Sequence, residues 1–143
     1  EIVDFTVDGY PEILNNISKS NVIVYILDTG KNGVPGISGR LKSMNILGID
    51  PKKSIKKSLA DKYVSITKEG MARHEWGHIL EYSLTQQEAQ KIGIYGMKYY
   101  SSEYAKLNYR EKWAEFICEI TKPGFKISKL PKEIQGIARK LLK

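Results

Sequence analysis

The sequence predicts an α+β fold with a small mixed sheet, in a single domain of 143 residues. Three observations point to this fold class. A β-branched apolar run at 22–27 and a short alternating run at 63–67 are typical of strands, and apolar residues recur with helical periodicity through most of the second half. The length is typical of one domain, and no internal repeat, low-complexity segment or linker divides the chain. We therefore expect residues 1–143 to form one domain.

The first half is expected to alternate strands and helices. The run at 22–27 predicts a buried central strand, and weaker alternation at 2–7 predicts another. Pro11 suits the first turn of a helix. Residues 28–39 are punctuated by glycine and proline, which predicts a loop or wide hairpin, and no Gly-Lys-Ser/Thr follows that would make a phosphate-binding loop. A second helix is expected at 50–60, because an Asp-Pro pair opens it.

The second half is expected to be mainly helical after the strand-like run. A helix is predicted over 69–82. Capping residues predict three further helix starts: Thr85, which opens a capping box, Asn108, and Pro131. The stretch 95–104 is rich in tyrosine, glycine and serine and is expected to be irregular.

The charge of the chain allows two interpretations. The net charge is +7 and the isoelectric point is near 9.4, so the surface attracts acidic partners at low salt. The densest lysine cluster, at 52–57, surrounds Ile55 and precedes Leu59, as on the solvated face of an amphipathic helix. Few aromatic residues interleave with these lysines, so a stacking surface for nucleic acid is not indicated.

Composition leaves the cellular location open. The apolar content of 41% and mean hydropathy of −0.37 are ordinary for a globular protein, and no apolar run approaches the length of a membrane span. The single cysteine, Cys118, excludes an intramolecular disulfide. Because the chain begins at Glu1 without a signal peptide, we expect a processed form or a piece of a longer polypeptide. The location is unknown from these data, with a secreted or delivered effector slightly favoured.

The two histidines of the chain lie in the sequence His74-Glu-Trp-Gly-His78, within the predicted helix 69–82. Residues four apart on a helix share one face, about 6 Å apart along the axis, so both imidazoles can bind one metal ion. Glu75 projects about 100° away from His74, beside the metal, which suits a general base acting on a metal-bound water. This pattern predicts zinc-dependent hydrolysis.

A catalytic zinc site needs a third protein ligand. No third histidine exists and Cys118 lies in an apolar helical context, so a carboxylate is expected. Glu111 and Glu115 are one helical turn apart, with the small Ala114 between them. One can bind the metal while the other accepts a hydrogen bond from a ligand histidine. The alternative is that both glutamates face solvent beside neighbouring basic residues.

These motifs resemble a known family. His-Glu-x-x-His followed by Glu-x-x-Ala-Glu at 111–115 is similar to the gluzincin-type zinc metallopeptidases. The closer resemblance is to the catalytic domain of the anthrax toxin lethal factor family and the related Pro-Pro endopeptidases. Members of that family have a tyrosine seven residues before the first glutamate, and Tyr104 stands seven residues before Glu111. The resemblance covers about 63–116, with Trp76 where the family has phenylalanine.

The resemblance implies a compact zincin-like metallopeptidase domain in which a second helix carries the third ligand. The zinc ligands that it implies are His74, His78 and Glu111. It implies that Glu75 is the general base, that Tyr104 donates a hydrogen bond to the oxyanion, and that Glu115 orients a ligand histidine. Residues 63–67 would form the edge strand that pairs with an extended substrate.

We therefore expect a zinc metalloendopeptidase that cleaves a protein or peptide by Glu-assisted attack of zinc-bound water. Its expected setting is a toxin or effector module, a secreted protease, or a processing enzyme of a mobile element. Two alternatives stay open. The first is a non-catalytic zinc-binding structural or interaction domain of zincin fold, against which the intact Glu75 argues. The second is a basic nucleic-acid-binding module, which no recognition motif supports. We expect no specific nucleic-acid partner, no membrane span, and a monomer.

Overall fold

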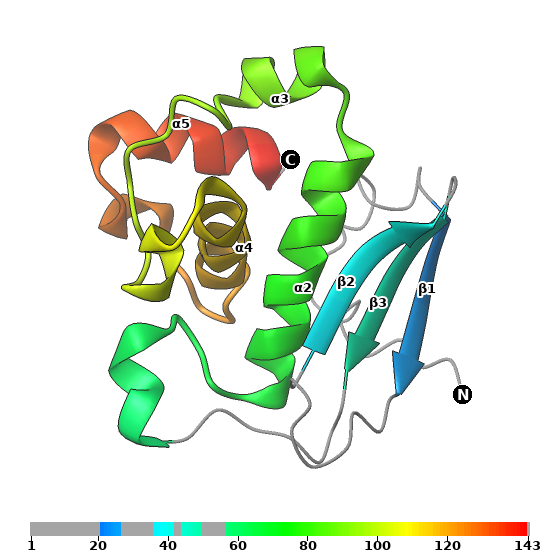
Figure 1. Ribbon diagram of the computed structural model, residues 1–143. Helices are drawn as coiled ribbons and strands as arrows, with labels where there is room; N and C mark the ends of the chain where they lie inside the picture. The colour runs from blue at the N-terminus through cyan, green and yellow to red at the C-terminus, as the bar shows by residue number, and fades with distance from the viewer. Residues whose placement is uncertain (1–20, 27–35, 42–43, 50–56, 143) are drawn as a thin grey trace.

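The structure is a computed structural model, and it describes two kinds of segment (Figure 1). The backbone is described for residues 21–26, 36–41 and 44–49, and both backbone and side chains are described for 57–142, except the side chains of Lys68 and Ser83. The strand predicted at 2–7, the helix predicted after Pro11 and most of the helix predicted at 50–60 lie outside the described residues.

Three short strands are described upstream of the helices: β1 (Asn21–Ile26), β2 (Gly36–Leu41) and β3 (Met44–Ile49). Their order is β1-β3-β2, with β1 parallel and β2 antiparallel to β3. Among the described strands β3 is central and β1 lies at an edge, whereas the sequence predicted a central strand at 22–27. The predicted loop at 28–39 is also wrong at its end, because β2 begins at Gly36.

Residues 57–142 overturn the predicted α+β fold class. This part of the chain is 65% helical and contains no strand or sheet, so the segment that carries the candidate site is helical. The strand predicted at 63–67 is absent. The backbone N–H of Val64 donates to the carboxylate of Glu115, and Thr67 caps the following helix. Because side chains bind these backbone groups, the alternation of apolar and polar residues here does not lead to strand pairing.

The longest described helix is α2 (Lys68–Ser83), which carries both histidines. Thr67 Oγ1 accepts a hydrogen bond from Gly70 N at 3.0 Å, so the helix starts where a capping threonine permits it. The prediction of a helix at 69–82 is confirmed within one residue at each end. Helix α2 is followed by α3 (Gln86–Ile92), whose capping box at Thr85 is present as predicted.

Helix α4 (Tyr109–Ile120) carries both candidate glutamates. Asn108 Oδ1 accepts from Glu111 N at 3.0 Å, which confirms the predicted cap. The chain then reaches α5 (Lys132–Leu141), directly after Pro131. Three short 3₁₀ helices complete the described elements: η1 (Lys57–Lys62), η2 (Tyr104–Lys106) and η3 (Ile127–Lys129). Residues 57–60 thus form a 3₁₀ turn where the sequence predicted the end of a longer helix.

Helices α2 and α4 pack against each other at close range. A β-carbon built at Gly77 would lie 2.7 Å from Ala114 Cα and 3.1 Å from Ile117 Cβ, so only glycine fits at this point of α2. The aromatic core beside this contact includes Trp113, whose Nε1 donates to Ile94 O at 3.1 Å. The small residues at the crossing set how near the glutamates of α4 come to the histidines of α2.

A single thiol lies at the same helix pair. Cys118 is buried on α4 and donates from Sγ to Gly70 O on α2 at 3.2 Å. Its own carbonyl oxygen accepts from Arg73 Nε at 3.5 Å. Burial raises the pKa of this thiol to about 12.

Helix α2 lies between the strands and the other helices (Figure 1). On one side it contacts β2 and β3, and on the other it contacts α4. The histidine-bearing face of α2 is therefore directed to α4 rather than to the sheet. In the described part of the chain, no helix has both the length and the apolar character to cross a membrane.

Candidate metal centre

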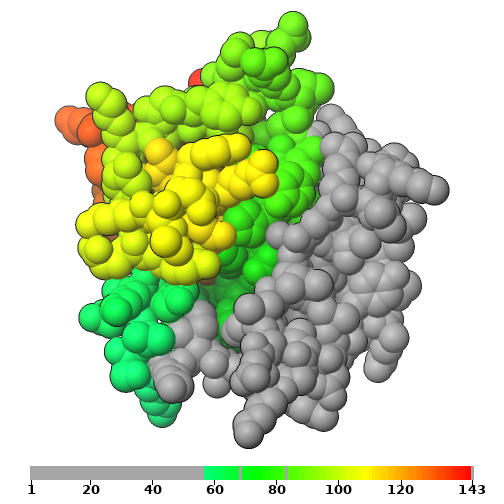
Figure 2. All heavy atoms as spheres, viewed as in Figure 1, coloured from blue at the N-terminus to red at the C-terminus, as the bar shows by residue number. Residues whose placement is uncertain are grey.

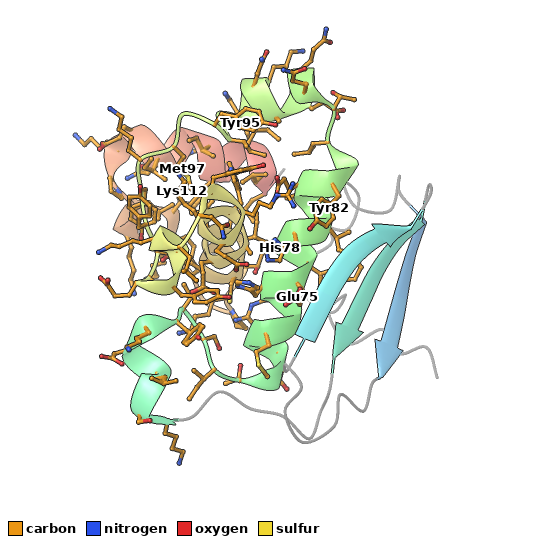
Figure 3. All side chains as sticks on the ribbon, in the orientation of Figure 1. Glu75, His78, Tyr82, Tyr95, Met97 and Lys112 are labelled. Carbon is orange, nitrogen blue, oxygen red and sulfur yellow. The ribbon has the colours of Figure 1, made fainter. Side chains whose placement is uncertain are left out.

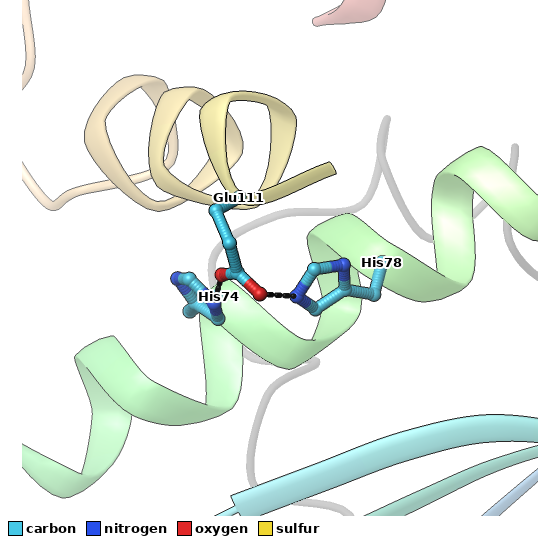
Figure 4. A group of neighbouring side chains, drawn as sticks. All are labelled: His74, His78 and Glu111. Atoms are coloured by element: carbon cyan, nitrogen blue, oxygen red, sulfur yellow. Dashed lines mark ion pairs between the residues drawn. The ribbon is translucent and has the colours of Figure 1, made fainter. Parts of the chain in front are cut away.

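Helices α2 and α4 bring three potential metal ligands together. His74 and His78 lie one turn apart on α2, with ring centroids 5.0 Å apart. Glu111, in the first turn of α4, has Oε2 2.9 Å from His74 Nε2 and Oε1 3.5 Å from His78 Nε2. Figure 4 shows this carboxylate between the two imidazoles. The potential ligand atoms all lie within 4.8 Å of one another, the spacing that one metal ion can bridge.

A hydrogen bond on the far side of the ring orients His74. Its Nδ1 lies 2.7 Å from Glu115 Oε1. Because an ionised carboxylate only accepts, Nδ1 carries a proton and Nε2 is the nitrogen directed to Glu111. Metal-binding histidines are commonly held in this way. His78 differs, since its buried Nδ1 has no hydrogen-bond partner within the described residues.

Charge is concentrated in this cluster. Burial alone would lower the pKa of His74, but hydrogen bonds to Glu111 and Glu115 and the charge of Glu75 raise it to about 9. Burial would raise the pKa of Glu111, whereas its bonds to His74 and His78 lower it to about 2. At neutral pH the metal-free cluster thus has an ionised carboxylate and a protonated imidazole. The surroundings stabilise a positive charge at the point where the three side chains meet.

This donor set fits a zinc ion. Two imidazole nitrogens and one carboxylate oxygen form one of the ligand sets of catalytic zinc sites. A divalent cation would take the place of the proton on His74, because ligand imidazoles bind metal in their neutral form. The three side chains could therefore hold a metal ion, and their donor atoms are of the types that zinc binds.

Glu115 is the most buried member of the site, with 2% of its surface exposed. Its second oxygen, Oε2, accepts from Val64 N at 2.8 Å and from Ser102 Oγ at 2.6 Å. Burial would raise the pKa of Glu115, but the bonds from His74, Ser102 and Val64 lower it. An ionised carboxylate can stay buried here because donors surround both of its oxygens.

Tyr104 lies beside the histidine cluster, at the start of η2. Its ring centroid is 5.9 Å from that of His74 and 4.7 Å from that of Tyr63. Burial, reinforced by the negative charge of Glu111 and by Tyr63, raises the pKa of Tyr104 to about 12. The phenol therefore keeps its proton at neutral pH and can donate a hydrogen bond.

The structure places Glu75 on the same helix as the two histidines, just below His78 in the view of Figure 3. Its side chain is partly buried. Its negative charge acts on both His74 and Tyr104, raising the pKa of each. Glu75 is thus close enough to His74 and to Tyr104 for its charge to affect the protonation of both.

The six predicted site residues are therefore gathered at one place, and the surface there is built from distant parts of the chain. On the face shown in Figure 2, the yellow segment near residues 100–112 lies against the green of α2, with η1 below it. Packing of η2 on α4 brings the tyrosine-bearing turn to the glutamate-bearing helix.

Sequence reasoning missed two contributors to the site. Ser102 and the backbone N–H of Val64 both donate to Glu115, and neither belongs to a metal-binding pattern. One local feature was readable for Ser102. It stands three residues before Ala105, whose N–H it binds at 3.2 Å, as serines do at the start of a helical turn.

Comparison with protein-family models, curated proteins and solved structures finds no significant match to this chain. The case for a metal centre therefore depends on the geometry of the cluster and on the chemistry of its donors. The family resemblance of the two motifs stays a prediction.

Proposed function

We propose that this chain is a zinc-dependent metalloendopeptidase of the gluzincin type, acting on a protein or peptide. The observation that carries the proposal is the cluster of His74, His78 and Glu111, whose ligand atoms lie within 4.8 Å of one another. Structural zinc sites have four protein ligands, whereas catalytic sites have three and leave a position for water or substrate. A set of three from the described residues favours the catalytic type.

The three ligands would hold zinc between α2 and α4. When bound, zinc supplies Lewis acidity, which polarises a carbonyl group and lowers the pKa of water to about 7. Glu115 contributes by keeping His74 Nε2 directed to the cluster through the bond at Nδ1. Val64 N and Ser102 Oγ hold the other oxygen of Glu115, so the carboxylate that orients His74 is itself fixed in place.

Two further residues would act on the substrate. Glu75 would accept a proton from the attacking water and deliver it to the leaving amine, as a general base and then a general acid. Tyr104 would donate its phenolic O–H to the oxyanion that develops on the scissile carbonyl. A donor in this position contributes about 2.7–4 kcal/mol in comparable sites. Its pKa of about 12 supports the role, since the proton must be present at working pH.

The segment at 63–67 has no part in this proposal as a substrate-pairing strand. Val64 N–H is bound to Glu115, and the hydroxyl groups of Ser65 and Thr67 lie 2.9 Å apart in a hydrogen bond. These bonds serve the metal centre and the start of α2. Location also stays a prediction, with a secreted or delivered effector the favoured one.

The test is a search for new peptide termini. Zinc-loaded wild type and Glu75→Ala would each be incubated with a diverse peptide library, and products would be identified by mass spectrometry. New termini from wild type alone would support the proposal and display the cleavage preference. If wild type bound one equivalent of zinc and produced none, a structural or interaction role would replace it. Equal products from both proteins would contradict the assignment of Glu75 as the general base.

A further inference from the structure

Ser102 makes two hydrogen bonds that lead in opposite directions. Its Oγ donates to Glu115 Oε2 at 2.6 Å and accepts from Ala105 N at 3.2 Å. A serine hydroxyl has one proton to donate and lone pairs to accept, so both bonds form together. The first leads to the metal centre, and the second leads into η2, the turn that begins with Tyr104.

The path from Ser102 continues through Glu115 to a metal ligand. Glu115 accepts from Ser102 on one oxygen and from His74 Nδ1, at 2.7 Å, on the other. Since Glu115 is buried and ionised, neither bond can be replaced by solvent without opening the site. Three hydrogen bonds thus join the imidazole of His74 to the backbone of η2.

The same carboxylate holds a second segment against Tyr104. Val64 N donates to Glu115 Oε2 at 2.8 Å, and the ring of the preceding residue, Tyr63, packs on Tyr104 at a centroid distance of 4.7 Å. Two contacts of Glu115 therefore bear on Tyr104. Glu115 holds the turn that contains Tyr104 through Ser102, and it holds the segment that carries the Tyr63 ring through Val64. The position of Tyr104 depends on Glu115 through both contacts.

We propose that Ser102 is a positioning residue, which couples the orientation of His74 to the position of Tyr104 through Glu115. This inference rests on the proposed function for its catalytic consequence. The hydrogen-bonded path itself belongs to the protein with or without metal. A serine that only caps η2 would need the bond to Ala105 alone, whereas coupling requires the bond to Glu115 as well.

The first test uses nuclear magnetic resonance on the full chain, without metal and with zinc. Only two histidines are present, so histidine labelling yields two imidazole spin systems, and the Tyr104 ring resonance is identified by its loss in Tyr104→Phe. We expect Ser102→Ala to shift both the His74 Nδ1–H resonance and the Tyr104 ring resonance. Ser101→Ala is the matched control, because it removes a hydroxyl from the same segment and keeps the bond to Glu115. It should leave both resonances in place.

The second test is kinetic, on a peptide substrate obtained from the library. We expect Ser102→Ala to lower kcat by about 10- to 100-fold, the range for residues that support a metal centre from outside, while KM stays unchanged. Ser102→Thr retains the hydroxyl and should restore most of kcat. Should Ser102→Ala fail to fold, Ser102→Cys replaces it, because a thiol has a similar size and is a weak donor.

Coupling would be overturned if Ser102→Ala left the Tyr104 resonance unmoved, or if Ser101→Ala moved both resonances equally. It would also be overturned if kcat were unchanged in Ser102→Ala while wild type cleaved the substrate. Failure of the proposed function is a separate result: wild type would not cleave, and the shifts of His74 and Tyr104 would still decide whether the two are coupled.

Discussion

Gly77 on α2 lies against Ala114 on α4 so closely that a β-carbon at Gly77 would come within 2.7 Å of Ala114 Cα. In sequence, Gly77 lies between His74 and His78 on α2, and Ala114 lies between Glu111 and Glu115 on α4. Helix packing and ligand geometry therefore depend on the same contact, since any side chain at Gly77 pushes α4 away from the histidines.

Gly77→Ala is expected to destabilise the protein. Inserting a methyl group where backbone and Ile117 leave no room costs about 1–3 kcal/mol, even though alanine is the better helix former. Zinc affinity should fall as well, because Glu111 moves with α4. Chemical denaturation and competition with a chelator would measure the two effects.

Gly136→Ala is the matched control for that substitution. Gly136 is exposed in α5, and a β-carbon built there meets no described atom within 4 Å. The change should stabilise the protein by about 0.5–1 kcal/mol and leave zinc affinity unchanged. If both glycine variants had the same effect, close packing at Gly77 would not be the cause.

Glu75→Gln is expected to keep zinc and lose hydrolysis. The amide has nearly the same shape but cannot accept the proton, and a positioned general base contributes about 10²–10⁴-fold to the rate. Zinc stoichiometry, thermal unfolding and kcat/KM should be measured on one preparation. Activity equal to that of wild type would exclude Glu75 as the base.

Glu111→Gln and Glu115→Gln should differ in zinc affinity. Glu111 Oε1 and Oε2 face both imidazoles, so its loss removes a ligand, whereas Glu115 contacts His74 only at Nδ1. We expect Glu115→Gln to weaken zinc binding by about 10- to 100-fold and Glu111→Gln to weaken it more. Equal losses, or a larger loss in Glu115→Gln, would contradict the ligand assignment.

A pair outside the candidate metal centre predicts a pH dependence of stability. Tyr99 Oη donates to Glu119 Oε1 at 2.8 Å, and burial together with this carboxylate raises the pKa of Tyr99 from 10.0 to about 12. Because the folded-state pKa is the higher one, the stabilisation is complete below pH 10 and is lost as the pH rises toward 12. The difference in unfolding free energy between wild type and Tyr99→Phe should shrink across this interval. A constant difference would contradict the assignment.

Local sequence patterns predicted the helices well, whereas hydrogen bonds between residues far apart in the sequence were predicted poorly. Thr85 and Asn108 begin helices because each side chain caps the turn that follows it, and α5 begins directly after Pro131. The run at 63–67 has the alternation of a strand, but Val64 N binds a carboxylate 51 residues away. Such a partner is invisible to any local pattern.

The site followed a similar division. The spacing of His74 and His78 predicted a ligand pair, because residues one turn apart share a helix face, and the family resemblance implied Glu111 as the third ligand. The fold brings these three side chains together where the two helices cross at small residues. Ser102 was missed because its contribution depends on a buried carboxylate from another element. Hydrogen bonds of that kind arise only once the helices have packed.

Cys118 allows the separation of the two ligand-bearing helices to be measured by chemical labelling. Its thiol is buried between the two ligand-bearing helices and bound to Gly70 O, and its pKa of about 12 leaves almost no reactive thiolate in the closed protein. A thiol reagent can reach it only after α2 and α4 separate. As the chain has no other cysteine, the rate of thiol labelling measures how often the two helices separate. Zinc should lower this rate, because it would hold the two helices together.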